Sequence, residues 1–145
     1  MKKAIDIAKK SKNDIPIGAV LVKNNEIIAQ AHNEKELLQQ VSKHAEMIVI
    51  EQACKKLKNW RLEDCSLYVT LEPCPMCTWA ILQSRIKEIY YGSCDNLYGA
   101  MGSKLDLRDL LNSKIIVKGG ILEEECDNLL KQYFEKMRND NKAKF

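Results

Sequence analysis

The sequence predicts an α/β fold, a three-layer α/β/α sandwich around a mixed sheet of about five strands. Short apolar segments rich in β-branched residues alternate with longer segments of helical periodicity after an opening hairpin. This alternation indicates a sheet covered by helices on both faces. The 145 residues show no internal repeat and no low-complexity linker. A chain of this length suits one domain with a sizeable core, so a single domain is expected over residues 1–145.

Each element is expected from the spacing of its apolar residues. Asn24-Asn25 is typical of a two-residue hairpin turn, and Pro75 suits the first turn of a helix. A glycine-containing loop is expected over residues 92–103, and a frayed tail over residues 139–145. The expected order is helix 2–11, strand 15–23, strand 27–30, helix 44–58, strand 66–71, helix 75–84, strand 86–91, a short helix near 104–111, strand 115–117 and helix 121–138.

Composition limits the class of function. Hydrophobic residues make up 46% and charged residues 30% of the chain, as in ordinary soluble globular proteins. The N-terminal lysines precede no apolar segment of signal-peptide length, and no segment is long and apolar enough to span a membrane. We therefore expect a cytoplasmic protein without a membrane partner. The net charge of +3 is too small to indicate a nucleic-acid partner by itself.

The six cysteines divide into two groups. Two of them form the spacing Cys74-x-x-Cys77, which is short enough for both thiolates to bind one metal ion. The other four are expected to be small buried residues in a reducing compartment rather than disulfide partners. These four are Cys54, Cys65, Cys94 and Cys126.

The residues that carry chemistry are His44-x-Glu46 and Cys74-x-x-Cys77. One histidine and two cysteines give three ligands for zinc and leave one tetrahedral position for water, as in catalytic rather than closed structural sites. Glu46 is not needed as a ligand. A carboxylate beside zinc can take a proton from water and return protons to a substrate nitrogen. The pattern therefore predicts a hydrolytic zinc site with Glu46 as the proton shuttle.

Helix geometry restricts where these residues can lie. Residues two apart on a regular helix point about 200° apart, so His44 and Glu46 can share a site only at a helix start. A proline after Cys74 indicates a second helix start, and the positive ends of two helices favour thiolates. Two other interpretations of the cysteine pair remain open, a redox pair and a structural zinc site closed by Cys65 or Cys94. Glu46 and the prolines favour the catalytic site.

The two motifs together resemble the signature of the zinc nucleobase deaminases, His-x-Glu followed by Pro-Cys-x-x-Cys. From about residue 5 to residue 138 the chain resembles the bacterial tRNA-specific adenosine deaminases of the cytidine deaminase-like superfamily. The Gly-Ala-x-Gly-Ser loop at 99–103 and the C-terminal signature favour this branch. The segments that carry the resemblance are residues 15–20, 31–33, 67–77, 84–86, 91–92, 95, 99–103, 120–122, 125–126 and 133–134.

The resemblance implies a cytidine deaminase-like fold and the hydrolytic deamination of adenosine to inosine at the wobble position of a tRNA anticodon. It also implies one Zn²⁺ per subunit, a tRNA anticodon stem-loop as partner, a homodimer and no organic cofactor. Asn33 and the backbone at Ala45 would contact the flipped base, Asp95 the sugar, and Phe134 the pocket wall. The implied site residues are the zinc ligands His44, Cys74 and Cys77, the catalytic Glu46, and the substrate-binding residues Asn33, Ala45, Asp95 and Phe134.

The chain departs from the family pattern at several positions. Trp79 stands where glycine is usual, Gln83 where histidine is common, and Leu97 where lysine is frequent. Residues 40–43 lack the usual Asp-Pro-Thr, and Glu135 replaces a common arginine. Several of these changes remove positive charge or polarity from the expected RNA side. None of them touches the zinc motif.

Two other functions stay open. Residues 72–77 also resemble the guanine deaminases of the superfamily, so the substrate could be a free base or nucleoside of the guanine or cytosine type. The second alternative is a non-catalytic, zinc-stabilised RNA-binding protein, against which the intact Glu46 argues. Single residues have structural alternatives as well. Asn33 and Asp95 suit turns, His32 is interpreted as structural, and at least one residue of Tyr133-Phe134 is expected in the core.

Overall fold

A mixed sheet organises the molecule, and the computed structural model describes it over residues 1–144. Five strands lie in the order β2-β1-β3-β4-β5, which confirms the predicted fold class. β1 pairs antiparallel with β2 and β3, whereas β3–β4 and β4–β5 are parallel. The elements are α1 (Lys2–Ala8), β1 (Gly18–Lys23), β2 (Glu26–His32), α2 (Lys35–Leu38), α3 (Ala45–Leu57), β3 (Cys65–Leu71), α4 (Pro75–Gln83), β4 (Glu88–Ser93), α5 (Arg108–Leu111), β5 (Ile116–Lys118) and α6 (Glu123–Ala143).

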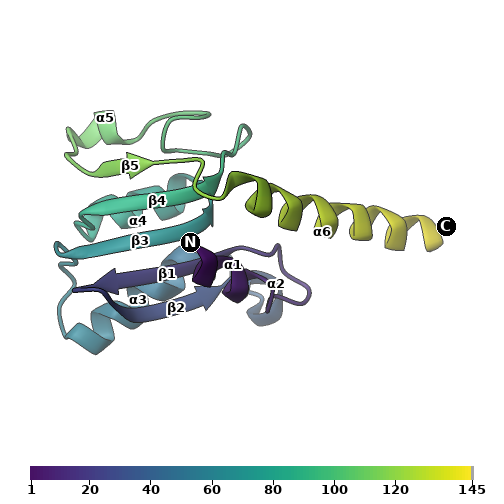
Figure 1. The fold of residues 1–145 in the computed structure, drawn as a ribbon, viewed down its shortest axis with the longest axis horizontal. Coiled ribbons are helices and arrows are strands. Elements are labelled where there is room, and N and C mark those ends of the chain that lie inside the picture. Colours follow the sequence, from purple (N-terminus) through teal and green to yellow (C-terminus); the bar gives the residue numbers. More distant parts are fainter. Residues whose placement is uncertain (145) are drawn as a thin grey trace.

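Helices lie on both faces of the sheet (Figure 1). In that view α3 and α4 lie behind the strands and α1 lies in front of them. α6 contacts β4 and then projects beyond the edge of the sheet (Figure 1). The parallel pairing of β3 and β4 brings their carboxyl ends to one edge, where the chain continues into α4 and into the loop after Ser93. That edge is where α/β folds place their ligands.

The core lies between the sheet and the helices α3 and α4. Leu21, Leu67 and Ile89 come from three neighbouring strands, and Val49 and Ile81 come from the two helices. All five side chains are fully buried. Removing this apolar surface from water stabilises the fold by about 25 cal/mol per Å². The packed core fixes the two helix starts that lead into the site.

The observed elements differ from the expected ones mainly at their ends. Asn24 and Asn25 both have positive φ angles, 51° and 61°, which confirms the expected hairpin turn. α2 was not expected from the sequence. α6 continues without a break to Ala143, beyond the helix end expected at residue 138, and so includes residues 139–143 of the expected tail. Phe145, the last residue of that expected tail, lies outside the described residues.

Across residues 1–144, no helix combines the length and the apolar character that crossing a membrane requires.

Candidate metal and substrate site

Three side chains with nitrogen or sulfur donors come together where two helices begin. His44 is the N-cap of α3 and Cys74 the N-cap of α4, both with extended backbone. The Nδ1 atom of His44 lies 3.7 Å from Sγ of Cys74 and 3.4 Å from Sγ of Cys77. The three donor atoms all lie within 4.8 Å of one another. The expected helix starts are confirmed, and this cluster can hold a metal ion.

The chemistry of the cluster fits such an ion. One imidazole nitrogen and two thiolates form a donor set that zinc prefers. Glu46 lies beside them and is buried, with 4% of its surface exposed. Its Oε1 atom is buried without a hydrogen-bond partner among the described residues. A carboxylate oxygen in this position is free to receive a proton from a molecule bound at the cluster.

Hydrogen bonds and burial shift the pKa values of the cluster residues in different directions. A hydrogen bond from Cys77 lowers the pKa of the Cys74 thiol to about 4. The same hydrogen bond and burial raise the pKa of Cys77, so the negative charge lies on Cys74. A hydrogen bond to Cys74 raises the pKa of His44. Burial raises the pKa of Glu46 to about 7, where a carboxyl group can both accept and donate protons near neutral pH.

A cavity of about 490 Å³ opens above the cluster, within the range of small-molecule sites. His44, Cys74 and Glu46 line it together with residues from distant parts of the chain. Aromatic and apolar side chains form part of its wall, which suits the flat faces of a nucleobase. The other lining residues are Asp14, Ile15, Ile17, Asn33, Lys35, Glu36, Leu71, Glu72, Pro75, Asp95, Tyr98, Tyr133, Phe134 and Met137.

Asn33 is buried and oriented by the start of α3. Its Oδ1 atom accepts a hydrogen bond of 2.8 Å from the backbone N–H of Ala45. Ala45 itself is fully buried and does not line the cavity. With the oxygen of Asn33 held in this way, its NH₂ group is the donor available to the cavity. A base that bound the N–H of Ala45 would have to share it with Asn33.

Asp95 and the aromatic pair of α6 reach the same cavity from the other side. Oδ1 of Asp95 accepts hydrogen bonds from the N–H groups of Leu97 and Tyr98, each at 3.0 Å. The expected turn role of Asp95 is therefore correct, and Asp95 also lines the cavity. Tyr133 and Phe134 meet edge to face with ring centroids 5.3 Å apart. Both line the cavity, and the expectation that one of them lies in the core is wrong.

The remaining candidate metal ligands lie apart from the cluster. Nδ1 of His32 lies 3.0 Å from the carbonyl oxygen of Asn33, in keeping with a structural histidine. Within residues 1–144, the metal-binding group consists of the predicted histidine and the two predicted cysteines, without Cys65 or Cys94. The interpretation as a structural zinc site closed by either cysteine is therefore wrong.

Two of the unusual residues lie away from the cavity. Gln83 lines a separate cavity together with Arg85 and Lys114, and Leu97 is 73% exposed. Sequence reasoning missed Glu72, Tyr98 and Met137 as lining residues. Only Glu72 carried a signal, because an acid between an apolar strand and a metal-binding cysteine is unusual for a buried position.

Comparison with known proteins agrees with this geometry. The family model for MafB19-like deaminases matches residues 1–138. A tRNA-specific adenosine deaminase of Bacillus subtilis (strain 168) is 48% identical over 147 aligned residues, which cover 99% of this chain and 91% of the relative.

Solved structures indicate the same family. One, from a study of A-to-I editing by tRNA:A34 deaminases at the wobble position of transfer RNA, matches with a TM-score of 0.82 and 37% identity. The match covers 90% of this chain and 97% of that one. A guanine deaminase of Bacillus subtilis matches with a TM-score of 0.61 and 41% identity, but covers only 64% of this chain and 61% of its own. The sequence, the fold and the His-Cys-Cys cluster agree: the chain belongs to the tRNA-specific adenosine deaminase family.

Proposed function

We propose that this protein hydrolyses the exocyclic amino group of adenosine to give inosine at the wobble position of a tRNA anticodon. The observation that carries the proposal is the unpartnered oxygen of Glu46 beside a His-Cys-Cys cluster at the base of a cavity. Membership of the tRNA-specific adenosine deaminase family supplies the substrate. An anticodon loop suits such a cavity, because its unpaired bases can leave the stack at little cost.

We propose that the metal is Zn²⁺, held by His44, Cys74 and Cys77, one ion per subunit. Zinc with three protein ligands lowers the pKa of water to about 7 and so supplies a nucleophile at neutral pH. Two thiolates and one imidazole suit zinc better than magnesium or calcium, which prefer oxygen ligands. The extended backbone at the two helix N-caps lets these side chains converge.

Glu46 moves the protons of the reaction. Its carboxylate accepts a proton from the attacking water, whose oxygen forms a bond to C6 of the adenine ring. The same group delivers this proton to the ring nitrogen, then takes the remaining proton of the attacking oxygen and passes it to the amino group, which leaves as ammonia. Burial, which raises the pKa of Glu46 to about 7, keeps both protonation states accessible. The net result exchanges one C–N bond for one C–O bond without any redox change.

The other residues of the cavity would bind the flipped nucleotide. The NH₂ group of Asn33 is the donor that we assign to the base, with the N–H of Ala45 as a second, shared donor. Asp95 would accept a hydrogen bond from the sugar. Phe134 would form the wall beside a neighbouring nucleotide, since aromatic rings stack on bases whatever their identity.

We also propose a homodimer and a cytoplasmic location. Trp79 on α4 is 43% exposed only two positions from Cys77, and large exposed aromatic side chains are enriched at protein interfaces. All six cysteines are free, a condition that persists in a reducing compartment such as the cytoplasm.

The experiment that tests the proposed function is a substrate panel read by mass spectrometry. The zinc-loaded protein is incubated with an anticodon stem-loop carrying a wobble adenosine and, separately, with free adenosine, guanine and cytosine. Conversion of the stem-loop adenosine to inosine, with the free compounds unchanged, is the expected result. Turnover of a free base with an unchanged stem-loop would move the protein to the guanine or cytosine type. An inert protein that still binds zinc and RNA would favour the non-catalytic alternative.

A further inference from the structure

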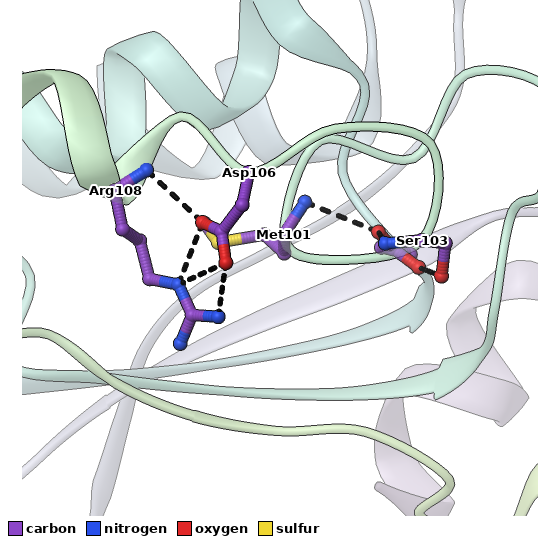
Figure 2. Close-up of polar contacts among 5 residues, drawn as sticks. Met101, Ser103, Asp106 and Arg108 are labelled. Carbon is purple, nitrogen blue, oxygen red and sulfur yellow. Dashed lines mark hydrogen bonds and ion pairs between the residues drawn. The ribbon is translucent and has the colours of Figure 1, made fainter.

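Glu72 is a buried acid whose side-chain hydrogen bonds all go to one loop. It lies two positions before Cys74 and is only 2% exposed. Its Oε1 atom accepts the N–H of Asp95 at 3.3 Å and the hydroxyl of Ser103. Its Oε2 atom accepts the N–H groups of Met101 at 3.1 Å and of Ser103 at 3.2 Å. Figure 2 shows Met101 and Ser103 drawn together on that loop. Four donors thus converge on one carboxylate.

The loop formed by residues 95–103, here called the Asp95–Ser103 loop, is shaped around this carboxylate. Gly99 passes so close that an added Cβ atom would collide with the carboxylate of Glu72 and with the carbonyl of Asp95. The N–H of Ala100 also donates to the carbonyl of Pro73 at 2.9 Å. The loop is therefore attached at several points to the short segment that carries Cys74 into α4.

Burying a carboxylate is unfavourable unless several hydrogen bonds replace its water. A hydrophobic residue here would avoid that cost but could not hold three backbone N–H groups in place. The network has a second consequence. It joins the segment that carries a metal ligand to a loop whose residues Asp95 and Tyr98 line the substrate cavity. Glu72 also lines this cavity, and its hydrogen bonds hold the metal-binding segment and the loop next to each other.

We propose that Glu72 is a positioning residue for the substrate, acting through Asp95 and Tyr98 by holding the Asp95–Ser103 loop against the metal-binding segment. It contacts no reacting atom. The proposal rests on the proposed function, because it assigns these two residues to the wall that receives the nucleotide. It follows that weakening the network loosens substrate binding, while His44, Glu46 and the cysteines keep their geometry. The loss should therefore fall on KM rather than on kcat.

The test uses Glu72→Gln, which keeps size and shape but replaces an acceptor oxygen by an NH₂ group that faces N–H donors. Zinc per chain, Tm, kcat and KM on the wobble stem-loop, and amide hydrogen exchange are measured. We expect KM to rise at least about tenfold, as the loss of charge-assisted hydrogen bonds suggests. Zinc content should stay at the wild-type value and kcat within about threefold of it. Exchange should accelerate in residues 95–103 and not in β3 or β4.

Two controls separate positioning from stability. Ile89→Val weakens the core far from the loop and should lower Tm without raising KM. Asp106→Asn breaks the ion pair with Arg108 at the far side of the same region (Figure 2), and should leave KM unchanged. If Glu72→Gln does not fold, Ser103→Ala tests the same network, because it removes one donor and keeps the carboxylate. Its KM should rise by a smaller factor, about two- to fivefold.

The outcomes decide whether Glu72 positions the substrate or only stabilises the fold. A wild-type KM in both Glu72→Gln and Ser103→Ala overturns the proposal. So does a fall in kcat or zinc content that follows Tm as in Ile89→Val. If the wild-type protein itself leaves the stem-loop unchanged, the proposed function fails, and hydrogen exchange still decides the positioning role. Faster exchange confined to residues 95–103 supports it, and unchanged exchange in that loop overturns it.

Discussion

Glu46 combines deep burial with an oxygen atom that has no hydrogen-bond partner among the described residues. Among residues 1–144, three buried side-chain polar atoms lack a hydrogen-bond partner, and Oε1 of Glu46 is one of them. Native proteins leave few such atoms, because an unsatisfied buried acceptor loses its hydration without compensation. The proposed role as proton shuttle accounts for this cost, since the partner of the oxygen would be the water and then the substrate.

Replacing Glu46 by glutamine is the direct residue-scale prediction. Glutamine preserves the shape of the side chain but cannot take up and release the protons. We expect turnover to fall about a hundred- to ten-thousandfold, the range of general acid–base catalysis, with zinc content and Tm near the wild-type values. Single-turnover kinetics, zinc analysis and thermal unfolding of the same preparation measure the turnover, the zinc content and the Tm.

The matched control is Glu51→Gln. Glu51 lies on the same helix, but its carboxylate is paired with Lys43 and Lys55 at the surface. Such exposed pairs contribute little to stability, so full activity is expected. Activity of Glu46→Gln within tenfold of the wild type would remove the assigned role.

The elements of the fold explain why the site forms where it does. A regular helix cannot direct His44 and Glu46, two positions apart, to one point unless the histidine lies at the helix start. The structure has this arrangement, with His44 and Cys74 as N-caps and Pro75 at the first position of α4. Parallel pairing of β3 and β4 then brings the two loops that follow these strands to one edge.

Gly18 gives a stability prediction at the scale of elements. It lies at the start of β1, where α1 packs on the strand, and an added Cβ atom would come within 2.7 Å of the backbone nitrogen of Ala8. The neighbouring atoms are backbone and cannot rotate away. We expect Gly18→Ala to lower the free energy of unfolding by about 1–3 kcal/mol, as overpacking does. Unfolding in urea measures this change in the free energy of unfolding.

Lys3→Ala serves as the control, because Lys3 lies on the exposed side of α1. Its unfolding free energy should change by less than about 0.5 kcal/mol. A Gly18→Ala variant as stable as the wild type would mean that α1 does not pack closely on β1.

Local patterns predicted much of the site, and long-range contacts account for the rest. Apolar periodicity predicted five strands and their order along the chain, and motif spacing predicted the three clustered side chains that could hold a metal ion. The hydrogen bonds of Glu72 could not be predicted, because its partners lie 23 to 31 positions away. The contact between Ala45 and Asn33, 12 positions apart, likewise depends on how β2 meets α3.

Helix ends were predicted least well. α6 was expected to end near residue 138, because the following residues are polar and no apolar stripe continues there. In the structure α6 projects past the sheet and reaches Ala143 (Figure 1). The polar residues at its end are exposed. A solvated helix of this kind gives no burial signal that could mark where it stops.

At the scale of the whole molecule, the proposed homodimer gives the next prediction. Trp79 is 43% exposed on α4, the helix that carries Cys77. Burial of such a side chain in an interface contributes strongly to affinity. We expect the wild type to sediment at twice the mass of the chain, and Trp79→Gln to raise the dimer dissociation constant at least about tenfold. Trp60→Gln, an exposed tryptophan elsewhere, is the control. Equal dissociation constants for all three proteins would exclude Trp79 from the interface.

One cavity is lined by residues of the His-Cys-Cys cluster, by Glu46 and by the wall residues, and we propose that it makes the protein a wobble adenosine deaminase. Position-resolved mapping of inosine tests it most directly. A single anticodon stem-loop carries adenosine both at the wobble position and at another loop position, and is treated with the wild type and with Glu46→Gln. We expect inosine at the wobble position alone with the wild type, and none with the variant. Three results would contradict this assignment: inosine at both positions, no inosine at either position although zinc is bound, or as much inosine with the variant as with the wild type.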